Sequence, residues 1–140
     1  MAQYLEGVDR RSFALGMINA CAEMVAAGVK PLALSPPIDD ELFESIRKGS
    51  DEIVANWKVA SYVESELIET DLFLASMTNG ITVILYAESE GVLEEYQALK
   101  QERSAMVANH TYEGANRRSV ARRFGRLLGY SEDMIEVKLS

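Results

Sequence analysis

Three arginines spaced four residues apart carry the clearest chemical signal in this sequence. Arg118, Arg122 and Arg126 repeat at about the interval of one helical turn, so a helix through them would present their guanidinium groups as one stripe. Guanidinium groups bind carboxylates and phosphates through paired hydrogen bonds. Tyr112 and His110, in the loop before this helix, can add hydrogen bonds to such an anion. We therefore predict an anion-binding site made of these three arginines and Tyr112.

The charge distribution offers a competing role for the same arginines. The chain carries 14 Lys and Arg against 22 Asp and Glu, for a net charge of -8. Residues 1–102 hold 18 of the acidic side chains, whereas residues 103–140 hold 7 basic and 4 acidic ones. This asymmetry favours a basic C-terminal helix that pairs with the chain's own acids or with a second subunit. The net charge and the lack of aromatic residues among the arginines argue against nucleic-acid binding.

Acidic residues supply a candidate catalytic base. Glu64 and Glu88 follow apolar segments that are typical of strands, and Glu66, Glu69 and Asp71 come soon after the first of them. Such carboxylates can bind Mg²⁺ or transfer protons, but helix capping and solvated strand ends explain them equally well. The enzyme hypothesis therefore takes Glu64 or Glu88 as base, with the arginine helix holding a small carboxylate or phosphate ester.

The sequence lacks the motifs of several common cofactor and metal sites. Neither GxGxxG nor GxxxxGK[ST] occurs, and acidic residues occupy the predicted helix starts where a phosphate would bind. Cys21 and His110 are the only cysteine and histidine, so no zinc-ligand spacing is present. We predict no cofactor and no metal site. The lone Cys21 lies on an apolar helical stripe, which indicates a core thiol and favours a reducing, cytosolic setting.

Apolar spacing and turn residues predict an alternation of helices and strands. Helices are expected at 11–27, from 39 onward with a break at Gly49-Ser50, at 71–77, 91–108 and 117–128, and after Ser131. Strands are expected at 29–34, 58–64 and 81–87. The last of these is β-branched and almost continuously apolar, which is typical of a strand covered on both faces. Periodicity leaves 58–64 open between strand and helix, and we choose strand.

This alternation predicts one α/β domain over residues 1–140. We expect about three mostly parallel strands joined by crossover helices, with additional C-terminal helices. In such a sheet the carboxyl ends of the strands share one rim, where ligands usually bind. The turns at 35–40, 64–71 and 88–91 would then lie together.

These features favour a small binding or regulatory module in the cytosol. No apolar stretch is long enough to span a bilayer, and the N-terminus lacks the basic leader of a signal peptide. Amphipathic helices at both ends of a short chain suggest surface that a second copy would cover. We expect a homo-oligomer whose alanine-rich first helix or arginine-rich helix forms the interface, with a small anion as a possible ligand.

Overall fold

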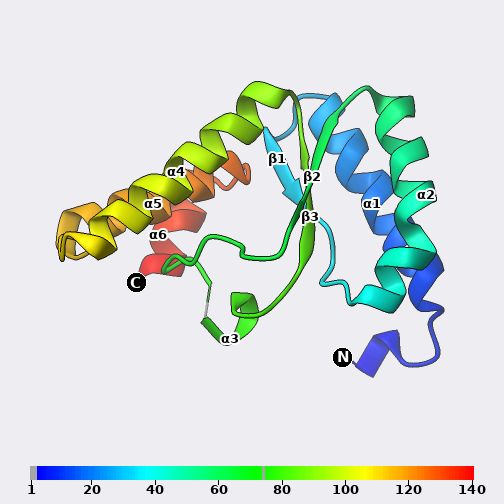
Figure 1. Ribbon diagram of the computed structural model, residues 1–140, viewed down its shortest axis with the longest axis horizontal. Coiled ribbons are helices and arrows are strands. Elements are labelled where there is room, and N and C mark those ends of the chain that lie inside the picture. Colours follow the sequence, from blue (N-terminus) through cyan, green and yellow to red (C-terminus); the bar gives the residue numbers. More distant parts are fainter. Residues whose placement is uncertain (1–2, 74) are drawn as a thin grey trace.

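A three-stranded sheet separates two layers of helices (Figure 1). The computed structural model describes residues 3–73 and 75–140. The strands are β1 (Leu32–Leu34), β2 (Ala60–Glu64) and β3 (Val83–Ala87). The helices are the short 3-10 helix η1 (Gln3–Leu5), α1 (Arg10–Ala26), α2 (Asp40–Trp57), α3 (Ala75–Thr78), α4 (Glu90–Ala108), α5 (Gly114–Leu127) and α6 (Glu132–Leu139). Helices α1 and α2 lie on one side of the sheet, and α4, α5 and α6 lie on the other (Figure 1).

The sheet is antiparallel throughout, so the predicted mostly parallel sheet is wrong. Its order is β1-β3-β2, and β3 runs antiparallel to both neighbours. The three predicted strands do exist, and α2 does connect β1 to β2, which run in the same direction. However, β3 pairs between them. Every residue of β3 is buried, and only the central position of the sheet covers such a strand on both faces and both edges. Apolar spacing carries no information on strand direction.

Strand direction also changes which turns lie together. Leu34 and Glu64, the last residues of β1 and β2, pair with Leu85 and Val83. The turns at 35–40 and 64–71 therefore leave the sheet at the same end of its strands. Ala87, the last residue of β3, pairs with the first residues of β1 and β2. The turn at 88–91 consequently lies at the opposite end of the strands. The three turns therefore do not share the single rim that was predicted.

Helix α2 continues through the predicted break at Gly49-Ser50. A Cβ atom on Gly49 would lie 2.8 Å from Cδ2 of Leu15 on α1, so the glycine permits close packing of the two helices. The Ser50 hydroxyl lies 2.7 Å from the hydroxyl of Tyr86 in β3. Both residues that resemble a helix break are therefore explained by tertiary contacts.

Local signals place most helix ends correctly. The Asp39 carboxylate accepts a hydrogen bond from the backbone N–H of Leu42 at the start of α2, and the Ser131 hydroxyl accepts one from Met134 at the start of α6. Lys58, at φ 57°, ends α2 in the left-handed conformation, so β2 begins two residues later than predicted. In the predicted helix 71–77, residue 74 lies outside the described residues, and the described helix begins at Ala75.

The two faces of β3 belong to two separate apolar clusters. Ile84 and Tyr86 pack with residues of α1 and α2, whereas Val83, Leu85 and Ala87 pack with residues of α4, α5 and α6. This is the alternation expected along a strand that is covered on both faces. Cys21 belongs to the first cluster, which confirms its predicted core position. No helix in the described part of the chain is long and apolar enough to cross a bilayer.

Candidate functional site

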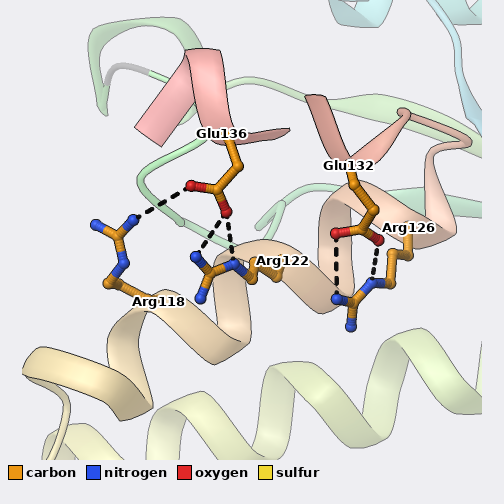
Figure 2. Close-up of polar contacts among 5 residues, drawn as sticks. All are labelled: Arg118, Arg122, Arg126, Glu132 and Glu136. Atoms are coloured by element: carbon orange, nitrogen blue, oxygen red, sulfur yellow. Dashed lines mark hydrogen bonds and ion pairs between the residues drawn. The ribbon is translucent and has the colours of Figure 1, made fainter. Parts of the chain in front are cut away.

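The predicted arginine stripe exists on α5, and it faces α6 (Figure 2). The Glu136 carboxylate accepts hydrogen bonds from Nη2 of Arg122 at 2.6 Å and from its Nε at 3.0 Å. Nη2 of Arg118 lies 3.8 Å from the other oxygen of Glu136. Nε and Nη2 of Arg126 donate to the Glu132 carboxylate at 2.7 and 3.3 Å. All three arginines therefore already have carboxylate partners within the chain.

These ion pairs match the alternative in which the arginines neutralise the chain's own acids. Arg126 donates to Glu132 and holds the pKa of that carboxyl below its usual value. The five side chains lie on the surface, between one third and two thirds exposed, and none of them lines any of the five main cavities of the described residues. Their geometry joins α5 to α6, and each guanidinium group is engaged by a carboxylate of α6.

Tyr112 lies among two other arginines. The guanidinium carbon of Arg103 lies 4.7 Å from the centre of the Tyr112 ring, and that of Arg117 lies 5.3 Å from it. The Tyr112 hydroxyl donates a long, 3.4 Å hydrogen bond to the Glu69 carbonyl oxygen. The structure thus separates Tyr112 from the predicted stripe and brings it to the turn that follows β2.

Tyr112 lines a polar depression that we call the Arg103 groove. It consists of two cavities of about 500 and 380 Å³, which share Glu69, Thr78 and Arg103. The first cavity is further lined by 65–68, Asn79, Gly80, Lys100 and Ser104. The second is further lined by Thr70, Asp71, Phe73, Ala75, Tyr112 and Arg117. The groove is large enough for a small ligand.

Arg103 is the least satisfied cation of this groove. Its side chain is 24% exposed, and its only ion pair among the described residues is with Glu69, at 3.8 Å. Its Nε is buried and has no hydrogen-bond partner among the described residues. An unpartnered buried N–H is costly. The guanidinium group also lies over the Tyr112 ring, whose face attracts a cation. The groove therefore contains a guanidinium group with an unused donor.

The other two cations of the groove are firmly paired. Arg117 donates to both carboxylate oxygens of Asp71 at 2.7 Å. This pair holds the pKa of the Asp71 carboxyl below its usual value and raises the pKa of Arg117. Nζ of Lys100 lies 3.1 Å from both oxygens of Glu64. Lys100 lines the first cavity, Asp71 and Arg117 line the second, and Arg103 lines both.

Glu64, one of the two predicted bases, is a buried structural carboxylate. Its side chain is only 4% exposed, and it accepts hydrogen bonds from the Tyr96 hydroxyl at 2.8 Å and from the Glu66 backbone N–H at 3.0 Å, in addition to Lys100. Glu88, the other predicted base, follows β3 at the opposite end of the strands. Neither carboxylate therefore faces the groove as a free base. The described residues hold no group of three or more His, Cys, Asp or Glu side chains that could bind a metal.

Sequence reasoning missed Lys100 and Arg103. Both lie inside α4, the predicted helix at 91–108, in which we predicted no site residue. A signal was present, since Tyr96, Lys100 and Arg103 follow one another at steps of four and three along a helix and so share one face. However, nothing in the sequence places Tyr112 beside that face, because the turn between α4 and α5 decides it.

The functional site therefore rests on geometry alone. No protein-family model, curated protein sequence or solved structure matches this chain.

Proposed function

We propose that this protein is a small binding or regulatory module that holds a small carboxylate or phosphate ester in the Arg103 groove. The observation that carries the proposal is the buried, unpartnered Nε of Arg103 above the Tyr112 ring. The Arg103 side chain is partly exposed, and a small shift that uncovers this N–H would let a carboxylate or phosphate oxygen accept from it and from a neighbouring guanidinium N–H together. Such a bond would remove the cost of the unpaired donor.

The surroundings of Arg103 support an anion as the ligand. Glu69 is 45% exposed and lies 3.8 Å from the guanidinium group, so a ligand anion can take its place at little cost. Lys100 and Arg117 flank the site on either side. Thr78, Asn79 and Ser104 add polar side chains to the lining. The net charge of -8 disfavours long polyanions but leaves a small anion free to enter a local site.

Binding is favoured over catalysis because of the state of Glu64. The enzyme hypothesis requires a strand-end carboxylate that faces the anion as a base. The Glu64 oxygens instead accept from Tyr96, Lys100 and a backbone N–H. A base must lie within reach of the proton that it removes, and this arrangement supports a structural role.

The proposed module is cytosolic and homo-oligomeric. Cys21 is buried in the first apolar cluster, and burial raises the pKa of its thiol, which suits a compartment without disulfide chemistry. Exposed apolar side chains support self-association: Met17 on α1 is 42% exposed, and Val137 on α6 is 70% exposed. The candidate interfaces are α1 and the α5–α6 surface.

The anion site is tested by titration with inorganic phosphate, citrate and glycerol 3-phosphate at low salt, followed by amide chemical shifts. We expect shifts that cluster around Ser104 and Tyr112. In Arg103→Gln we expect the affinity for the best ligand to fall at least tenfold, because the guanidinium donors are removed. Arg122→Gln is the matched control, since it removes an arginine from the surface stripe, and its affinity should change less than twofold.

Two outcomes would overturn the anion proposal. The first is equal loss of affinity in Arg103→Gln and Arg122→Gln, which would show a diffuse charge effect. The second is the absence of binding by all three anions at millimolar concentration.

Self-association is tested separately by light scattering over a hundredfold range of concentration. A strict monomer throughout would remove the homo-oligomer, and a larger species that Val137→Lys dissociates would place its interface on α6.

A further inference from the structure

The outer edge of β2 is unpaired in this sheet. β2 is an edge strand in the order β1-β3-β2. Its three central residues, Ser61, Tyr62 and Val63, are all exposed, whereas Ala60 and Glu64 at its ends are buried. An exposed strand edge presents backbone donors and acceptors that another extended chain can bind. In Figure 1, β2 is unobscured between α4 and the α1–α2 layer.

The register identifies which backbone groups face outward. The backbone N–H and carbonyl of Ile84 in β3 are both engaged by Ser35, which follows β1. Since Ile84 pairs with Val63, Val63 sits at a non-hydrogen-bonded position of the β2–β3 ladder. The alternation of antiparallel strands places Ser61 in the same class. The backbone N–H and carbonyl groups of Ser61 and Val63 therefore point away from β3.

A shallow groove runs beside this edge, between β2 and α4. We call it the β2–α4 groove. It has a volume of about 380 Å³ and is lined by Ser61, Tyr62, Glu90, Leu93, Glu94, Gln97, Ala98 and Gln101. Leu93 and Tyr62 provide apolar surface. Its charged side chains are both carboxylates, and neither Glu90 nor Glu94 has an ion pair among the described residues.

We propose that the β2–α4 groove binds an extended, basic peptide segment of a partner protein, which adds to the sheet as a fourth strand beside β2. Backbone bonds to Ser61 and Val63 would give affinity, and alternate side chains would enter the groove. Lysine or arginine side chains on that face would pair with Glu90 and Glu94. Their stems would cover the Tyr62 ring.

Charge selects this occupant over a second copy of the chain. An antiparallel pairing of β2 with its copy would be symmetric. It would bring the same acidic rim of each subunit toward the other, and like charges across an interface are unfavourable. A basic strand instead neutralises two unpaired carboxylates. The inference does not depend on the Arg103 groove, which shares no lining residue with this one.

The test uses the full chain and two labelled octapeptides. One alternates lysine with valine or threonine, and the other has glutamate in place of every lysine. Fluorescence anisotropy should show binding of the lysine peptide at least tenfold tighter than that of the glutamate peptide. Hydrogen exchange of the Ser61 and Val63 amides should slow when the lysine peptide is bound, because their N–H groups become ladder donors.

Three variants complete the experiment. Glu94→Lys should lower the affinity for the lysine peptide at least tenfold. Glu95→Lys makes the same charge change one residue away, outside the groove lining, and should have less than a threefold effect. Val63→Pro removes the outward N–H of residue 63 at an edge position that tolerates proline, and it should abolish the protection of the remaining Ser61 amide.

Each of three results would overturn this proposal. They are equal affinity for the two peptides, an equal effect of Glu94→Lys and Glu95→Lys, and unchanged exchange at Ser61 and Val63 in the bound state. Protection of these two amides in a peptide-free dimer would overturn it as well, since the edge would then belong to a second copy. If Val63→Pro does not fold, the two glutamate variants decide the question, because both change exposed positions of α4.

Discussion

At the scale of single residues, the hydroxyl groups of two buried tyrosines each have a hydrogen-bond partner. Tyr86 and Tyr96 are both fully buried, and burial raises the pKa of each phenol, that of Tyr86 to about 12. Tyr86 bonds to Ser50 on one side of the sheet, and Tyr96 donates to Glu64 on the other. These bonds attach a helix to a strand in each layer. These hydrogen bonds contribute to stability mainly because either group would be costly to bury without a partner.

The Ser50–Tyr86 pair predicts a measurable coupling. Tyr86→Phe leaves the buried Ser50 hydroxyl without this partner, and we expect it to lower the free energy of unfolding by about 1–3 kcal/mol. Ser50→Ala leaves the Tyr86 hydroxyl without its hydrogen-bond partner, and it should lower the free energy of unfolding by a similar amount. The double variant should lose less than the sum of the two single losses. Urea denaturation of all four proteins measures this, and strict additivity would contradict the role of the bond.

The Asp71–Arg117 pair predicts a dependence of stability on pH. The pKa of Asp71 is lower in the folded protein than in the unfolded chain, mainly because Arg117 hydrogen-bonds to its carboxylate. Its contribution is therefore present above the unfolded pKa and is lost as the pH falls through the folded one. Asp71 is 38% exposed, so we expect Asp71→Asn to cost only about 0.5 kcal/mol at pH 7.

The difference between wild type and Asp71→Asn should shrink as the pH falls below 4 and Asp71 becomes protonated in the folded protein. Urea midpoints across this range measure it. Glu113→Gln is a suitable control, because Glu113 is an exposed acid without an ion pair among the described residues. A difference that stays constant down to pH 2 would show that Asp71 acts through something other than its charge.

At the scale of elements, small residues decide how closely the helices approach. Gly125 on α5 faces α6, and a Cβ atom there would lie 2.8 Å from Cγ1 of Ile135 and 3.3 Å from Leu72. Gly49 has the same role between α2 and α1. The close approach at Gly125 accompanies the ion pairs between α5 and α6. The arginine stripe is thus part of a helix–helix contact, and its side chains remain partly exposed.

Two helical glycines should respond oppositely to alanine. Gly125→Ala forces Ile135 to shift, and we expect it to destabilise the protein by about 1–3 kcal/mol. Gly16 lies within α1, where an added Cβ meets nothing within 4 Å, so Gly16→Ala should stabilise by about 0.5–1 kcal/mol through helix propensity. Thermal unfolding of both variants measures the signs. Equal effects would mean that packing at Gly125 is not limiting.

At the scale of the whole molecule, β3 joins the two layers. Its side chains alternate between the cluster under α1 and α2 and the cluster under α4, α5 and α6. Trp57, the only tryptophan, bonds through Nε1 to Asn19 and so reports on the α1–α2 layer. Leu99, which is 1% exposed, lies in the other layer. If β3 couples the layers, the chain should unfold as one cooperative unit.

This coupling predicts that damage in one layer is detected in the other. Leu99→Ala should lower the free energy of unfolding by about 2–5 kcal/mol. Both the far-UV circular dichroism and the Trp57 fluorescence should show this loss, with coincident urea transitions. A Trp57 transition that stays at the wild-type midpoint would mean that the α1–α2 layer unfolds separately, which would also contradict a single domain over residues 1–140.

The sequence by itself determined the local elements and the most buried strand. Helix caps such as Ser131 and the apolar run ending at Ala87 depend on interactions between neighbours in the chain, so residue types reveal them. The arginine stripe on α5 was visible for the same reason. Strand direction was not, because a buried strand has the same composition in either direction. Gly49 also misled the prediction of a helix break. The residue that requires a glycine there, Leu15, belongs to another helix, so the local sequence does not reveal the contact.

Only the tertiary structure decided which charged groups meet. Arg118, Arg122 and Arg126 pair with acids of α6, whereas Tyr112 reaches Arg103 through the turn between α4 and α5. Positions far apart in the sequence become neighbours only when the layers pack. A guanidinium group carries the same charge in every setting, and its availability to a ligand depends on the partners that packing brings to it.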